Sequence, residues 1–169
     1  TTLGKALGNG FTIAAVGGRK EIMNKLAPGG NVYQASTFAG NPISVTAAIN
    51  SIKTINKMKN KLYEKLARNC ELLVDEIDDL ATDYKIPHQI NSLASMFQIF
   101  FTNKPVIDYK TSKKSNTKKF HKLFSNLLKN GVFIAPSQYE TVFLSDAHTD
   151  ANITKTIGAY GLSLEALRN

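Results

Sequence analysis

Lys5 has the surroundings that most favour covalent chemistry in this chain. It follows Gly4 directly and stands just ahead of the run Gly8-Asn9-Gly10. Neighbours without large side chains leave room for a flat ligand to approach the backbone. A lysine amine held in a restricted site can lose its proton and attack a carbonyl group, so Lys5 is a candidate Schiff-base former. The alternative is a solvated surface lysine, which is the commoner situation for this residue type.

A hydroxyl-bearing loop is the second candidate for ligand binding. Residues 31–40 form a predicted loop that contains Ser36 and Thr37, and Asn41 with Pro42 then has the signature of a helix N-terminus. Free N–H groups and the helix dipole favour an anion at such a position, which makes the loop a candidate phosphate site. The alternative is that both hydroxyl groups satisfy only their own turn. Spacing alone does not decide between these two interpretations.

A set of short motifs extends from this region to the end of the chain. In order, they are TTLGK, GGRKEIM, VYQAST, GNP, SMFQIFFT, GVFIAPSQYE and AHT. Together they resemble the glutamate-1-semialdehyde 2,1-aminomutases, a group of fold-type I pyridoxal-phosphate (PLP) enzymes closely related to the class III aminotransferases. Each motif alone is weak, but their order over nearly the whole chain makes the resemblance specific.

The resemblance implies a role for four residues. Lys5 matches the lysine that carries PLP covalently and moves a proton between substrate and cofactor carbons. Thr37 matches the threonine that binds the cofactor phosphate, in the dimer often from the neighbouring subunit. Tyr33 matches a tyrosine close to the substrate, and Glu140 matches a glutamate that faces the active site. Without the resemblance, Glu140 would be interpreted as an exposed loop carboxylate.

The chain also departs from the family pattern. Asn9 replaces the middle one of three glycines, Thr12 stands where proline is common, and Ala39 replaces a serine. The chain starts at Thr1 without a methionine, inside a motif that follows a long upstream segment in the family. That segment carries the aspartate for the pyridine nitrogen, the ring-stacking aromatic and the glycine-serine phosphate turn. We therefore expect a truncated chain that is inactive by itself.

The resemblance implies an isomerase that moves an amino group within its substrate. The complete enzyme would convert glutamate-1-semialdehyde into 5-aminolevulinate, the precursor of tetrapyrroles (porphyrin biosynthesis), as a cytoplasmic homodimer with shared active sites. One alternative is another class III aminotransferase that uses a different amino donor. A third hypothesis, from a different class, is a basic binding module.

Composition limits the possible partners. The net charge is +8, but residues 103–130 alone contain eight lysines against Asp108. Phe120 and Phe124 lie there at helical spacing, so we interpret the segment as a solvated lysine face over a core and expect no nucleic-acid partner. Apolar runs are all shorter than the ~18 residues of a membrane span, and we expect no membrane partner. One cysteine, Cys70, and three scattered histidines predict neither a disulfide nor a metal site.

Hydrophobic periodicity predicts two domains with an α/β to α+β organisation. The resemblance implies that residues 1–57 are the end of a large PLP-binding domain. The pattern of these residues predicts a buried strand at 13–18, a short helix at 19–26 and a buried helix from Pro42 to about Lys57. Residues 58–169 would be a small C-terminal α+β domain that begins with a long amphipathic helix from Met58 to Leu80. The following elements are predicted in that domain: strands at 88–93, 95–102, 132–135 and 141–144, a helix from about 116 to 130, and a last helix from about 149.

Overall fold

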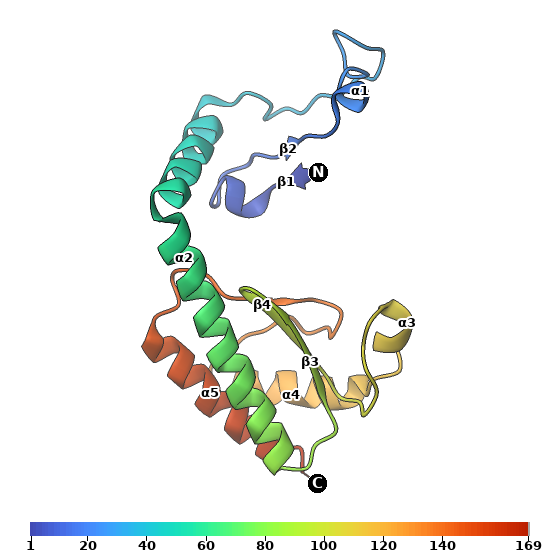
Figure 1. Cartoon of the computed structure of the whole chain (residues 1–169), viewed down its shortest axis with the longest axis vertical. Coiled ribbons are helices and arrows are strands. Elements are labelled where there is room, and N and C mark those ends of the chain that lie inside the picture. Colours follow the sequence, from blue (N-terminus) through green and yellow to red (C-terminus); the bar gives the residue numbers. More distant parts are fainter. Residues whose placement is uncertain (169) are drawn as a thin grey trace. The chain divides into compact units, whose positions relative to one another are not determined.

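The computed structural model describes residues 1–168, which divide into two compact units. The first unit is Thr1–Lys59 and the second begins at Asn60. Helix α2, Pro42–Asp83, contributes to both units (Figure 1). The sequence predicted two helices that meet near residues 57–60, and this was wrong, because the backbone is helical throughout. No glycine or proline interrupts α2 after Pro42, so nothing local ends the first helix.

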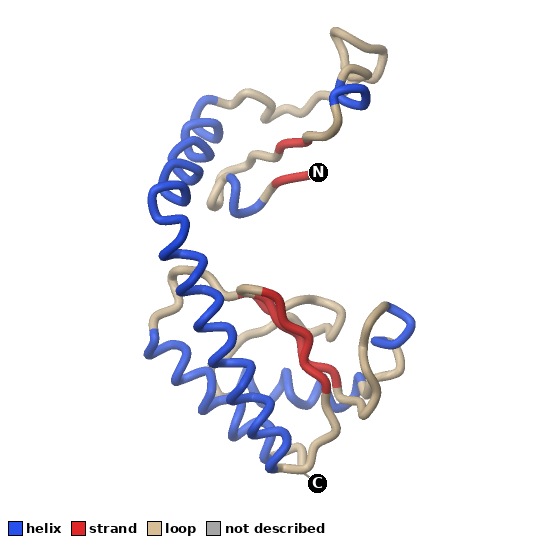
Figure 2. The backbone as a smooth tube through the Cα atoms, in the orientation of Figure 1, coloured by secondary structure: helices blue, strands red, loops and turns tan. Residues whose placement is uncertain are grey.

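The first unit contains little regular structure ahead of α2, as the tube in Figure 2 shows. Its elements are β1 (Thr2–Leu3), the 3₁₀ turn η1 (Lys5–Leu7), β2 (Ala15–Val16) and α1 (Lys20–Met23). β1 and β2 form an antiparallel pair, and both residues of β2 are exposed. The predicted burial of the strand at 13–18 is therefore wrong, because a two-stranded ladder offers neither flanking strands nor a covering layer.

The beginning of α2 is capped as predicted but is not buried as predicted. The Asn41 Oδ1 atom accepts hydrogen bonds from the N–H groups of Ile43 and Ser44, both at 3.1 Å. Within residues 42–57 only Ser44 and Ala48 are buried, whereas apolar side chains such as Ile43 and Ile52 are exposed. The burial predicted from the alanine and β-branched residues was therefore wrong for residues 42–57, because the first unit supplies no layer that covers this face.

The second unit is an antiparallel sheet packed with helices. Its three strands lie in the order β3 (Gln89–Leu93), β4 (Met96–Phe100) and β5 (Val142–Phe143). Its helices are the later part of α2, α3 (Tyr109–Ser112), α4 (Thr117–Lys129) and α5 (Asp150–Glu165). In the register of the hairpin, Ile90 lies opposite Ile99. The strands predicted at 88–93, 95–102 and 141–144 and the two later helices are confirmed.

Two details of the second unit differ from the sequence prediction. The strand predicted at 132–135 is absent from the described structure, because the Val132 N–H bonds to the Leu127 carbonyl at 2.9 Å and closes α4 instead. Helix α3 was predicted as loop. It begins with a capping box, in which the side chains of Asp108 and Thr111 each accept a hydrogen bond from the other residue's backbone N–H group. The sequence prediction interpreted this segment by its lysines and missed the capping box.

The core of the second unit is continuous. It joins α2, the sheet, α4 and α5 through buried apolar side chains that include Ile77, Phe97, Phe120, Leu123, Leu127, Tyr160 and Leu164. Cys70 belongs to this core, as predicted, and burial raises the pKa of its thiol. Four consecutive residues of β4, 97–100, are buried, which confirms that both faces of this strand are covered. Seven of the eight lysines between residues 103 and 130 are exposed, whereas Phe120 is buried beneath them.

Within the described residues 1–168, no helix combines the length and apolar character needed to cross a membrane. The same residues contain no group of three histidine, cysteine, aspartate or glutamate side chains arranged to hold a metal ion.

Alanine substitutions at two glycines of the second unit should change the free energy of unfolding in opposite directions. Gly131 ends α4 with φ +79°, a conformation that costs an alanine about 1–2 kcal/mol. Gly158 lies within α5, and an added methyl group there meets no atom within 4 Å. We expect Gly131→Ala to lower the free energy of unfolding by about 1 kcal/mol and Gly158→Ala to raise it by about 0.5–1 kcal/mol. Urea unfolding of both variants tests this prediction, and changes in the free energy of unfolding that have the same sign would contradict it.

Candidate active site

Lys5 lies at the wall of a cavity in the first unit. The cavity measures about 540 Å³ and is lined by Lys5, by residues 11–14 and 16, and by Gln34, Ser36, Phe38, Ala39 and Gly40. Lys5 has φ +49°, a left-handed conformation that is uncommon outside glycine. Strained backbone of this kind persists where surrounding structure enforces it and is concentrated at functional sites. Asn9, Lys85 and Ala94 share this left-handed conformation.

The turn after Lys5 fixes its backbone. The Lys5 carbonyl accepts hydrogen bonds from the N–H groups of Gly8 at 3.1 Å and Asn9 at 3.2 Å. A side chain at Gly8 would collide with the Phe11 carbonyl and with Ile13, so this position requires glycine. Gly8 of the glycine-rich run therefore lets the turn pack closely against Phe11 and Ile13.

The loop of residues 34–40 also contributes to the lining of the cavity, and its two hydroxyl groups differ. The Ser36 Oγ accepts a hydrogen bond from the Phe38 N–H at 3.4 Å, and the Ser36 carbonyl accepts one from the Ala39 N–H at 3.0 Å. Ser36 thus satisfies its own turn, as the simpler interpretation held. Within the described residues, the exposed Thr37 hydroxyl makes no hydrogen bond, and it remains free for a ligand.

The helix that follows is a weaker anion site than the sequence suggested. Pro42 has no N–H group, Asn41 Oδ1 accepts from Ile43 and Ser44, and the Asn41 carbonyl accepts from Val45 at 2.9 Å. The prediction of free N–H groups at this terminus was therefore wrong. A phosphate near this loop would depend on hydroxyl and loop N–H groups and on the dipole of α2 rather than on orphan N–H groups of the helix.

The structure brings together only part of the predicted site. Lys5 lines the cavity with the 34–40 loop, but Tyr33 and Thr37 are not among the lining residues. Tyr33 is 84% exposed. Glu140 belongs to the second unit, where it is exposed on a turn closed by its own N–H bond to the Ser137 carbonyl at 3.0 Å.

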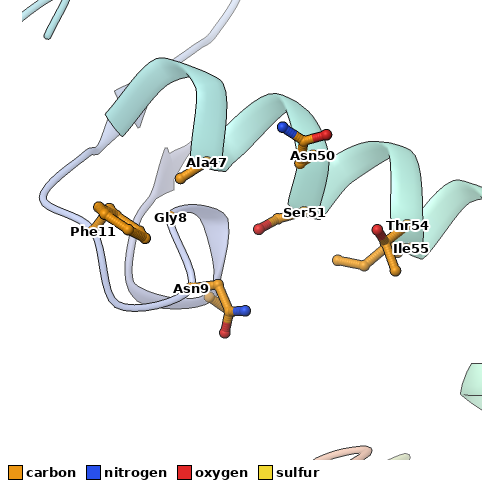
Figure 3. A pocket seen from close by; sticks show the side chains of 9 residues that line it. Gly8, Asn9, Phe11, Ala47, Asn50, Ser51, Thr54 and Ile55 are labelled. Carbon is orange, nitrogen blue, oxygen red and sulfur yellow. The ribbon is translucent and has the colours of Figure 1, made fainter. Parts of the chain in front are cut away.

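A second cavity, which the sequence did not predict, adjoins the turn after Lys5 (Figure 3). It measures about 440 Å³ and is lined by the turn and by one face of α2: Ala6, Gly8, Asn9, Phe11, Ala47, Asn50, Ser51, Thr54 and Ile55. Phe11 lines both cavities. The available signal was the spacing of Ala47, Ser51 and Thr54, which places small and polar residues on one face of α2.

Sequence comparison identifies close relatives along the whole chain. The pattern of the class-III aminotransferases matches residues 1–158. A glutamate-1-semialdehyde 2,1-aminomutase of Nitrosopumilus maritimus is 69% identical over 169 residues, which is 100% of this chain and 40% of the relative. A protein of Cenarchaeum symbiosum named glutamate-1-semialdehyde 2,1-aminomutase 1 is 54% identical over 99% of this chain and 40% of its own length. The chain thus spans about 40% of the length of these relatives.

Solved structures share the fold at lower sequence identity. An omega-transaminase from Sphaerobacter thermophilus superposes with a TM-score of 0.82 and 22% identity, over 99% of this chain and 38% of the other. A transaminase solved with PLP bound gives a TM-score of 0.80 and 20% identity, over 98% of this chain and 38% of the other. The fold is therefore that of part of a fold-type I transferase, as the sequence predicted. With a family pattern that matches all but the last residues, this chain belongs to the class-III aminotransferases.

Proposed function

We propose that this chain is the C-terminal part of a PLP-dependent glutamate-1-semialdehyde 2,1-aminomutase. The observation that carries the proposal is Lys5, held in a strained turn at the wall of a cavity. The 69% identity to a relative of that name supports the substrate. The motif GVFIAPSQYE favours the mutase over another class III aminotransferase, since that stretch is less widely shared than the lysine region.

The residues around Lys5 fit the proposed cofactor. A cavity of about 540 Å³ falls within the ~300–1,000 Å³ typical of small-molecule sites. Lys5 supplies the amine that would hold the cofactor aldehyde. Thr37 does not line this cavity, and its hydroxyl would bind the phosphate of a cofactor held by a second copy of the protein. When bound, PLP supplies an electron sink for the substrate carbon that loses a proton.

The chain's own residues then have separable tasks. The Lys5 Nζ would move the proton between the substrate carbon and a carbon of the cofactor. Tyr33 would contact the substrate, and the Glu140 carboxylate would accept hydrogen bonds from the substrate amine and orient it. Partners for the pyridine nitrogen and the ring face would come from the part of the relatives that this chain does not span. We therefore expect the isolated chain to be inactive.

An assay separates the mutase from a transaminase. The full-length protein should convert glutamate-1-semialdehyde into 5-aminolevulinate without any added keto acid. The isolated chain, assayed alongside, should show no turnover. A requirement for a 2-oxoacid as amino acceptor would contradict the mutase and favour another class III aminotransferase.

We also propose that two copies of the full-length protein share their active sites. The supporting observation is that Tyr33 and Thr37 are exposed and do not line the cavity of their own Lys5. A homodimer with two-fold symmetry would let each copy present these residues to the other. The cytoplasm is the proposed location, where the lone buried Cys70 would stay reduced.

Mixing two inactive variants tests the shared site. Lys5→Ala and Thr37→Ala should each lower activity at limiting PLP by more than about tenfold, because each removes a cofactor contact. Subunits exchanged at equal amounts should recover about a quarter of the normal activity, since half of the dimers are mixed and each mixed dimer has one intact site. Unmixed variants serve as controls. If the mixed sample is no more active than the unmixed variants, Lys5 and Thr37 act within one chain.

A further inference from the structure

Two buried glutamines lie beneath the loop that carries Glu140. Gln98 is in the middle of β4 and is 5% exposed, and Gln138 lies two residues before Glu140 and is 2% exposed. The intervening chain between them includes α3, α4 and the loop itself. Side chains of this type are mostly exposed, so two buried glutamines at one place require a physical reason.

The two amides tie the loop to the rest of the unit. The Gln98 Nε2 donates a hydrogen bond to the Gln138 main-chain carbonyl at 2.7 Å. The Gln138 Nε2 donates one to the carbonyl of Ser112, at the end of α3, at 3.1 Å. Beside them, the rings of Tyr109 and Tyr139 are 5.7 Å apart. The loop is therefore bonded both to β4 and to the end of α3.

These bonds are made at an energetic cost. The Oε1 atoms of both Gln98 and Gln138 are buried and have no hydrogen-bond partner among residues 1–168. Each amide nitrogen faces a backbone carbonyl, which fixes the orientation of the amide and leaves its oxygen unpaired. A buried acceptor without a partner destabilises the folded state, so an apolar residue of similar size would suit stability better. Local departures of this kind are expected at sites kept for function.

Glu140 has few contacts of its own to define its position. Its side chain is exposed, and its N–H bonds only to Ser137 within the same turn. The position of its carboxylate is consequently set by the backbone of the loop. That backbone is anchored at Gln138, two residues away, through the bond from Gln98.

We infer that Gln98 and Gln138 are positioning residues that hold the Glu140 carboxylate in place for the reaction. This inference rests on the proposed function, because it takes Glu140 to act on the substrate. Because both side chains are buried, they act through Glu140 and not on the substrate itself.

A double-mutant cycle in the full-length protein tests the inference. Gln98→Met keeps the length of the side chain and removes the donor. It should lower kcat for semialdehyde isomerisation by about tenfold and leave KM within about twofold, because binding by the remaining contacts is unchanged. In a Glu140→Gln background, the same substitution should change kcat by less than about twofold, since the residue through which it acts is already disabled.

The control is Gln89→Met. Gln89 is half-buried on the neighbouring strand β3, and its Nε2 bonds only to the adjacent His88 carbonyl at 2.9 Å. This variant should leave kcat unchanged. Hydrogen exchange over residues 137–144 should accelerate in Gln98→Met and not in Gln89→Met, which reports the anchor independently of activity.

Each outcome decides the question. An equal fall in kcat in the parent and in the Glu140→Gln background overturns the inference, as does an unchanged kcat. If Gln98→Met does not fold, Gln138→Met is measured in the same cycle, and failure of both to fold shows that the pair is structural and overturns it. A parent protein that does not isomerise the semialdehyde contradicts the proposed function itself, and this is seen before any variant is compared.

Discussion

Replacing Lys5 by alanine is expected to abolish the isomerase activity of the full-length protein, with kcat lower by at least about 1,000-fold. The amine of Lys5 is the only group of this chain proposed both to hold the cofactor and to move the proton. No other lysine lines its cavity among the described residues. Removing the amine therefore removes two tasks at once, which is why this substitution should exceed every other in its effect on activity.

Chemical trapping checks the same prediction without relying on turnover. Incubation of the full-length protein with PLP, followed by borohydride reduction and peptide mapping, should place the cofactor on Lys5. The Lys5→Ala protein should show no specific label. Lys20→Ala is the matched control, since Lys20 is exposed in the same unit and outside the cavity. Label on scattered surface lysines in the parent protein would end the enzyme proposal and reopen the basic binding module.

Features that depend on a few neighbouring residues were predictable from the sequence. Asn41 and Thr149 cap α2 and α5 through their own side chains, and Gly131 ends α4 in a left-handed conformation. The strands predicted at 88–93 and 95–102 are β3 and β4, which pair with each other, and the apolar run of β4 is covered on both faces as predicted. Each of these signals comes from residues that are close together in the sequence, so no distant partner is needed to interpret it.

Features that depend on distant partners, or on which of two possible partners a group takes, were not predictable. The pattern at 13–18 suits a buried strand, but burial requires neighbours that the first unit does not contain. Residues 132–135 have strand-forming side chains, yet the end of α4 takes the Val132 N–H group. At the candidate site, the sequence identified Lys5 and its loop. It could not show that Ser36 and not Thr37 satisfies the turn.

The stability of the second unit should depend most on single large side chains in its core, and α4 allows a closely matched test. Leu127 is 0% exposed and its neighbour Leu128 is 50% exposed, on the same helix. Leu127→Ala deletes buried methyl groups and leaves a cavity among Phe120, Leu123 and α5, which costs about 2–5 kcal/mol. Leu128→Ala makes the identical chemical change and should cost less than about 1 kcal/mol.

Urea unfolding of the 169-residue chain followed by circular dichroism measures both substitutions. Because a domain of this size loses about 1–3 kcal/mol per molar urea, a loss near 3 kcal/mol lowers the midpoint by at least about 1 M. The main-chain bonds that Leu127 makes through its carbonyl are the same in both variants, so backbone effects cancel in the comparison. Equal midpoints would mean that α4 is not packed against α5 as described. A large difference would show that the second unit folds around this core even where the active site is incomplete.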